Sequence, residues 1–146
     1  MASISRFEDI EAWRAARELN QSLHALFRKP QLEMHWSLKN QTLRAAISIM
    51  ANIAEGFGRD GNREFQHFLS IAKGSAVEVQ SLLYIAGDVE PDLRQEVEEI
   101  RLLAVKTENL TAGFIRYLKQ SPRKGRLYPE SLSEDPHLQD DPDCLR

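Results

Sequence analysis

The chain has 146 residues, of which 42% are hydrophobic and 28% charged, and its formal net charge is -3. This composition excludes a wholly disordered chain, and the length suits a single domain with one core. Residues 121–146 hold four basic and six acidic side chains, so residues 1–120 hold 15 basic and 16 acidic ones. Residues 1–120 therefore lack the basic surplus that is typical of nucleic-acid-binding proteins.

The sequence also argues against a membrane protein or a redox protein. No apolar run reaches the roughly 18 residues that a membrane span needs, and no signal-peptide core follows the first residues. We therefore expect a cytoplasmic protein that does not bind membranes. The single cysteine, Cys144, cannot form an internal disulfide and stands beside Asp143 in an acidic stretch, which disfavours a reactive thiolate.

Apolar residues recur every three or four positions in four segments, and this spacing predicts four α-helices. The first covers residues 7–27, with a core face of Ala12, Ala16, Leu19, Leu23, Leu26 and Phe27. The second begins near Ser37, ends at the glycines of 56–61, and has a core face of Leu43, Ala46, Ile47, Met50, Ile53 and Ala54.

The third predicted helix covers residues 62–86 and should end at Gly87 and Asp88. Its core face is Phe65, Phe68, Leu69, Ala72, Ala76, Val79, Leu83 and Ala86. The fourth has Pro91 in its first turn, and its core face is Leu93, Val97, Ile100, Ala104, Thr107, Thr111, Phe114 and Leu118. The short connections favour an all-α fold, an antiparallel up-down-up-down four-helix bundle over residues 1–120. Residues 121–146, rich in proline and acidic residues, are expected to form a disordered tail.

Two short motifs resemble functional sites. Gly56, Gly58 and Gly61 have the G-x-G-x-x-G spacing of dinucleotide-binding loops, but they follow a helix, so we interpret them as a helix C-cap and a tight turn. Glu64 and His67 match one half of a di-iron motif, which needs a second copy and further glutamates. No catalytic arrangement can be assembled from the spacing of Ser, His, Asp and Cys. We therefore predict a non-catalytic protein without metal or cofactor.

A polar stripe follows one face of the second predicted helix. Its members are Gln41, Arg44, Ser48, Asn52, Glu55 and Arg59. One interpretation is a solvent-exposed face with internal ion pairs such as Glu55 to Arg59, while Arg44 could pair with Glu55 or, if the second and third helices are adjacent, with Glu78. The other is a surface for polar recognition, where short side chains allow another backbone to approach closely.

The third and fourth helices carry apolar residues beyond the core stripe that one bundle needs. These candidate interface residues are Ile71, Gly74, Leu82 and Ile85, and Leu103, Leu110 and Tyr117. Self-association would cover such flanks, whereas uneven wrapping of the helices would bury them inside one chain.

Three segments resemble a known family. They are Phe7 to Trp13, Arg44 to Arg59 with the run SIMANIAEGFGR, and Phe65 to Glu78. The chain is similar over about residues 4–119 to the bacterial four-helix-bundle family that is named after the 23S rRNA intervening sequence.

This resemblance implies a protomer that assembles into a homo-oligomeric ring, pentameric where known, without an established enzymatic activity. A related accessory protein of diversity-generating retroelements binds nucleic acid through a strongly basic surface. RNA or DNA binding through a basic face of the ring is therefore the alternative to a self-assembling interaction module.

Overall fold

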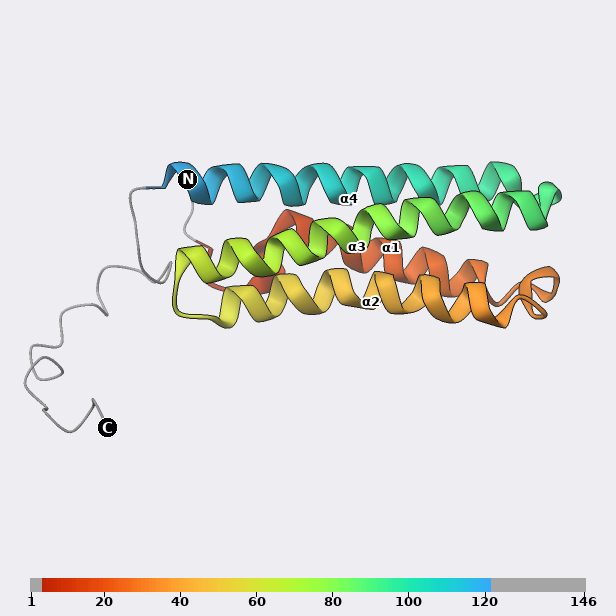
Figure 1. Cartoon of the computed structure of the whole chain (residues 1–146), viewed down its shortest axis with the longest axis horizontal. Coiled ribbons are helices and arrows are strands. Elements are labelled where there is room, and N and C mark those ends of the chain that lie inside the picture. The colour runs from red at the N-terminus through yellow and green to blue at the C-terminus, as the bar shows by residue number, and fades with distance from the viewer. Residues whose placement is uncertain (1–3, 122–146) are drawn as a thin grey trace, which may run out of the picture.

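The computed structural model describes residues 4–121, and within that range the chain forms α-helices and short 3-10 turns but no strand. Figure 1 shows the helices lying alongside one another along the long axis of the molecule. The four α-helices are α1 (Glu11–Leu26), α2 (Trp36–Gly58), α3 (Asn62–Val89) and α4 (Arg94–Gln120). The all-α prediction is confirmed. Most of the predicted acidic tail, residues 122–146, lies outside the described residues.

The start of the chain differs from the predicted single helix over residues 7–27. Residues Phe7–Asp9 form a 3-10 turn, and Ile10 then adopts an extended backbone with φ -76° and ψ 119° before α1 begins. Ile10 is almost fully buried. The helix is interrupted there because turning this apolar side chain into the core is incompatible with a continuous helix.

Helix α2 confirms the predicted element but corrects its core face. Ile47 was predicted to be buried, whereas its side chain is 52% exposed. Ala45 and Ile49, which were not predicted, are buried instead. They share a face with Ile53 and Gly56 at spacings of three and four residues, and this face is the one that meets the rest of the bundle.

Helix α3 continues beyond Gly87 and Asp88, where it was predicted to end. Gly87 is buried within the helix, and a methyl group added there would lie 3.8 Å from the side chains of Arg94 and Val97. The helix ends only at Val89, because Pro91 disfavours helical backbone at the residue before it. A 3-10 turn, Pro91–Leu93, leads directly into α4.

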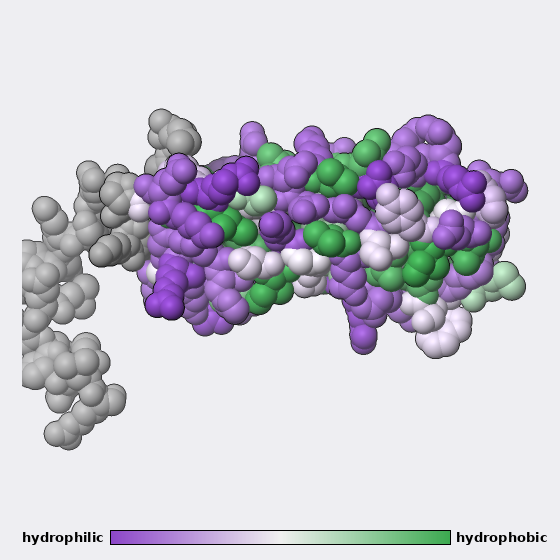
Figure 2. Space-filling view, turned by 45° about the horizontal axis from the view of Figure 1, so that its top comes forward, coloured by the Kyte–Doolittle hydropathy of each residue, from purple (hydrophilic) through white to green (hydrophobic). Residues whose placement is uncertain are grey.

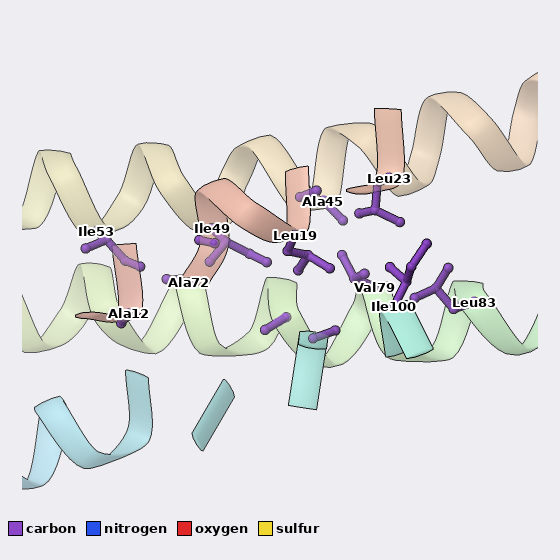
Figure 3. Packing of buried hydrophobic residues seen from close by; sticks show 14 of the residues in the cluster. Ala12, Leu19, Leu23, Ala45, Ile49, Ile53, Ala72, Val79, Leu83 and Ile100 are labelled. Carbon is purple, nitrogen blue, oxygen red and sulfur yellow. The ribbon is translucent and has the colours of Figure 1, made fainter. Parts of the chain in front are cut away.

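The buried hydrophobic residues form one cluster to which all four helices contribute. Figure 3 shows side chains from α1 (Leu19, Leu23), α2 (Ile49, Ile53), α3 (Val79, Leu83) and α4 (Ile100) directed into the same interior. In this bundle α2 packs most extensively on α3 and α3 on α4, while α1 contacts α2 and α4. Each helix thus has two neighbours, and the bundle has four seams.

One buried polar side chain joins two helices. Asn20 of α1 donates its amide hydrogens to the backbone carbonyls of Ala16 (2.9 Å) and Ala46 (2.8 Å), the second of which lies in α2. Because a buried amide is stable only when it is hydrogen-bonded, this contact fixes the register between α1 and α2.

The glycines at the end of α2 act differently from the predicted helix cap. No glycine among the described residues has a positive φ, so a left-handed cap is absent from residues 4–121. Gly56 lies inside the helix, where an added methyl group would lie 2.7 Å from Cβ of Phe68 and 2.8 Å from Cδ2 of Phe65. Its missing side chain therefore allows α3 to approach α2 closely.

Gly56→Ala should lower the free energy of unfolding by about 1–3 kcal/mol, because α2 and α3 must separate to admit the methyl group. Urea unfolding followed by circular dichroism measures this. Gly58→Ala is the matched control, since nothing lies within 4 Å of the added methyl group and the change should be neutral. Equal effects of the two changes would contradict the close approach at Gly56.

Candidate interaction surfaces

The polar stripe of α2 lies along the seam between α2 and α3, rather than on the side opposite the core. Gln41 donates a hydrogen bond to the carboxylate of Glu78 at 2.6 Å, and the hydroxyls of Ser48 and Ser75 are 2.9 Å apart. Both partners belong to α3. The stripe therefore joins two helices of the same chain.

The centre of this seam is satisfied internally. Asn52 donates to the backbone carbonyl of Ser48 at 2.8 Å and to its hydroxyl at 3.0 Å. Both side chains are half-buried. A partner would have to displace these bonds in order to use them, so Ser48 and Asn52 contribute to the packing of α2 on α3.

Arg59 is held at the end of α2 by three contacts. Its guanidinium donates to Glu55 at 2.8 Å, lies 3.6 Å from the carboxylate of Glu64, and sits 5.1 Å from the ring centre of Phe68. The hydrogen bond to Glu55 raises the pKa of Arg59 above its usual value. Arg59 thus fastens the end of α2 to the start of α3 across the connecting turn.

Arg44 has a different environment. Its side chain is exposed, and within residues 4–121 no hydrogen bond or ion pair joins it to another group. The suggested pairing of Arg44 with Glu55 or Glu78 does not form, whereas the predicted ion pair between Glu55 and Arg59 is confirmed and Glu78 binds Gln41 instead. Of the two arginines in the stripe, Arg44 is the one left available to a partner.

The apolar flank of α3 is largely uncovered. Ile71 is 41% and Ile85 46% exposed, Leu82 is half-buried, and no atom lies within 4 Å of a methyl group added at Gly74. Ile71, Leu82 and Ile85 fall on the same helical stripe as Ser75 and Glu78, which contact α2. The flank therefore borders the α2–α3 seam on its outer side.

The apolar flank of α4 lies elsewhere in the bundle. Leu103 and Leu110 are partly buried against the core, and the ring of Tyr117 stacks on Phe114 with centroids 5.8 Å apart. Leu103, Leu110 and Tyr117 follow Glu96 at intervals of seven residues and so lie on the same face of α4 as Glu96. Glu96 pairs with Lys29 near the end of α1 at 3.1 Å. The two flanks thus lie on different sides of the α3–α4 pair. The flank of α3 lies beside α2, and the flank of α4 lies beside α1.

Further exposed apolar residues were not predicted as surface features. Trp36 is 68% exposed, and together with Ile47 and Leu43 it lines a shallow hollow on the outer face of α2, with Arg44 as the only charged lining residue. Figure 2 shows that on the face in view hydrophobic residues form separate islands among hydrophilic ones. The helical period of α2 could have predicted the exposure of Ile47, because Ile47 lies about 160° around the helix from the buried Ile49.

The residues considered for metal binding or catalysis are dispersed. Glu64 faces Arg59, and His67 is exposed with its ring against Phe68. His24 bonds the backbone of Asn20, and His35 lies 3.3 Å from Glu90. In the part of the chain that the structure describes, no three His, Cys, Asp or Glu side chains are grouped as metal ligands. None of the helices described there is long and apolar enough to cross a membrane.

The fold and these surfaces define an α-helical bundle protein whose distinctive residues lie at helix seams. The model of the 23S rRNA-intervening sequence protein family matches residues 8–113, and the chain belongs to this family. The family resemblance inferred from the sequence motifs is thereby confirmed.

One solved structure with a similar fold is a protein of unknown function from the S23 ribosomal protein family of Bacteroides thetaiotaomicron VPI-5482. Its TM-score is 0.64 at 23% sequence identity, and the match covers 72% of this chain and 98% of that one. No curated protein matches the chain.

The two arginines of the stripe should respond differently to substitution. Arg59→Gln should lower the urea midpoint of unfolding, because it removes the contacts with Glu55, Glu64 and Phe68. Arg44→Gln should leave the midpoint unchanged. A loss of stability in Arg44→Gln equal to that in Arg59→Gln would show that Arg44 has a structural partner.

Proposed function

We propose that this protein is a non-catalytic, self-assembling interaction module of the cytoplasm, with an antiparallel up-down-up-down bundle as its protomer. The short connections between α2 and α3 and between α3 and α4 support this order of helices. The proposed assembly is a homo-oligomeric ring, and five protomers is the number that the family resemblance implies.

The observation that carries the proposal is the uncovered apolar flank of α3. Ile71 and Ile85 expose much of their side chains although the bundle core is complete without them. Gly74 between them leaves the helix surface open. Aliphatic side chains around a small residue allow a second helix to pack closely, and such burial would remove the apolar area from water.

A closed ring requires two different surfaces on each protomer, because every copy presents one side to the copy before it and another to the copy after it. The separation of the α3 and α4 flanks is compatible with that requirement. In this arrangement the α3 flank of one protomer packs against the α1–α4 side of the next, where Tyr117 remains 37% exposed.

Ile71→Glu and Ile85→Glu should each reduce the mass in solution to that of a single chain without loss of helicity, because a buried unpaired carboxylate is strongly unfavourable at an interface. Light scattering measures the mass and circular dichroism the helicity. Leu102→Glu is the matched control, since Leu102 is 54% exposed on α4 outside both flanks and the change should leave the mass unaltered.

A single-chain mass for the unmodified protein at tens of micromolar would contradict self-assembly. If Leu102→Glu dissociated the oligomer while Ile71→Glu and Ile85→Glu did not, the assembly would use another face of the bundle, and the assignment to α3 would be wrong.

Nucleic-acid binding is the alternative function, and the balance of 15 basic and 16 acidic residues over 1–120 disfavours it. We expect structured RNA to bind weakly and to dissociate as salt is raised, because such binding would depend on phosphate contacts alone. Titration of labelled RNA at low and near-physiological salt measures this. Binding below about 1 µM that persists at near-physiological salt would make the nucleic-acid function the better explanation.

A further inference from the structure

The hollow on the outer face of α2 combines apolar walls with one available positive charge. Trp36, Leu43 and Ile47 provide the apolar lining, and Arg44 is the only charged residue in it. Burying Trp36 and Ile47 would remove apolar area from water, so the hollow is suited to an occupant with aliphatic side chains.

Within α2 itself the charge near this hollow is of one sign, and the nearby carboxylate of Glu78 on α3 accepts a hydrogen bond from the lining residue Gln41. Residues 34–54 contain no Asp or Glu, and their two charged residues are Lys39 and Arg44. Since Arg44 has no partner within residues 4–121, its charge is available to a carboxylate. The occupant should therefore be acidic as well as apolar.

The chain itself contains a segment of this chemistry beyond the described residues. Residues 130–143 include Leu132 and Leu138 and carry no Lys or Arg. Their acidic residues are Glu130, Glu134, Asp135, Asp140, Asp141 and Asp143. The sequence of this segment therefore complements both the apolar lining and the charge of the hollow.

The chain length between α4 and this segment is sufficient. The amide of Asn62 donates to the carbonyl of Leu118 at 3.0 Å, so α4 ends beside the α2–α3 turn. From Gly58 back along α2 is about 16 Å of helix to Ile47 and about 33 Å to Trp36, and crossing the bundle adds about 20 Å. The 11 residues 122–132 can span up to about 40 Å and the 17 residues 122–138 up to about 60 Å, so Leu132 can reach Ile47 and Leu138 can reach Trp36.

We propose that residues 130–143 bind in the α2 hollow of their own chain, with Leu132 and Leu138 against Trp36 and Ile47 and the carboxylates around Arg44. This intramolecular contact does not depend on self-assembly, because the hollow lies on α2 and the proposed assembly flank on α3.

Cys144, the only cysteine, provides a position for a fluorescent acceptor next to the acidic segment, and Trp36 provides the donor when Trp13→Phe removes the other tryptophan. Energy transfer from Trp36 to the acceptor in the full-length protein reports whether the segment lies near the hollow. We expect efficient transfer at low salt and a fall of about twofold or more at high salt, because screening weakens the contact with Arg44.

Two changes should reduce the transfer at low salt to its high-salt value. One is Arg44→Glu, which reverses the charge in the hollow. The other replaces the acidic side chains by amides, through Glu130→Gln, Glu134→Gln, Asp135→Asn, Asp140→Asn, Asp141→Asn and Asp143→Asn. Lys106→Glu is the control, because it makes the same charge change at an exposed site on α4 and should leave the transfer unaltered.

Transfer that is insensitive to salt, to Arg44→Glu and to the amide replacements would overturn the proposal. A mixing experiment tests whether the contact is made within one chain. Unlabelled protein that keeps Trp36 is mixed with labelled Trp36→Phe protein. Transfer in that mixture would show that the segment binds a neighbouring copy and would overturn the intramolecular contact.

The mass measured by light scattering distinguishes this result from a failure of self-assembly. Arg44→Glu should change the energy transfer and leave the oligomer intact, whereas Ile71→Glu should dissociate the oligomer and leave the energy transfer unchanged. If the mass shows a single chain throughout, the energy transfer still tests the contact between residues 130–143 and the hollow.

Discussion

The close approach of α2 and α3 at Gly56 is the constraint on which the other features of this face depend. The missing side chain lets Phe65 and Phe68 of α3 lie against the backbone of α2, and an added methyl group would come within 3 Å of both. Phe65 in turn contacts the rings of Phe57 and Phe114, so the approach also connects α2 to α4. Once the helices are this close, the hydroxyls of Ser48 and Ser75 meet across the seam.

This packing gives a physical reason for much of the stretch Arg44 to Arg59 that identifies the family. Gly56 sets the distance between the helices, Ser48 and Asn52 satisfy the polar seam, and Arg59 binds across the turn to Glu64. These roles are structural and need no ligand. Arg44 is the exception, because the bundle supplies it with no partner among the described residues.

The two surfaces that these structural roles do not explain, the α3 flank and the α2 hollow, differ in chemistry and position. The α3 flank around Ile71 and Ile85 is aliphatic and borders a tight helix seam, which suits packing against another helix. The α2 hollow has a positive charge at Arg44, which suits an acidic segment. Because the two surfaces lie on different helices, a substitution in one leaves the side chains of the other unchanged.

The sequence by itself determined the four helices and most of the buried residues, including Leu19, Leu69 and Ala104, because burial along one helix repeats at the helical period whatever packs against it. It also identified the family. Only the tertiary structure decided which face of α2 meets the bundle, that Arg44 has no partner among the described residues, and that the flanks of α3 and α4 lie apart. Those outcomes depend on which helices become neighbours and how closely they approach, and residues distant in the sequence, such as Gly56 and Phe68, set both.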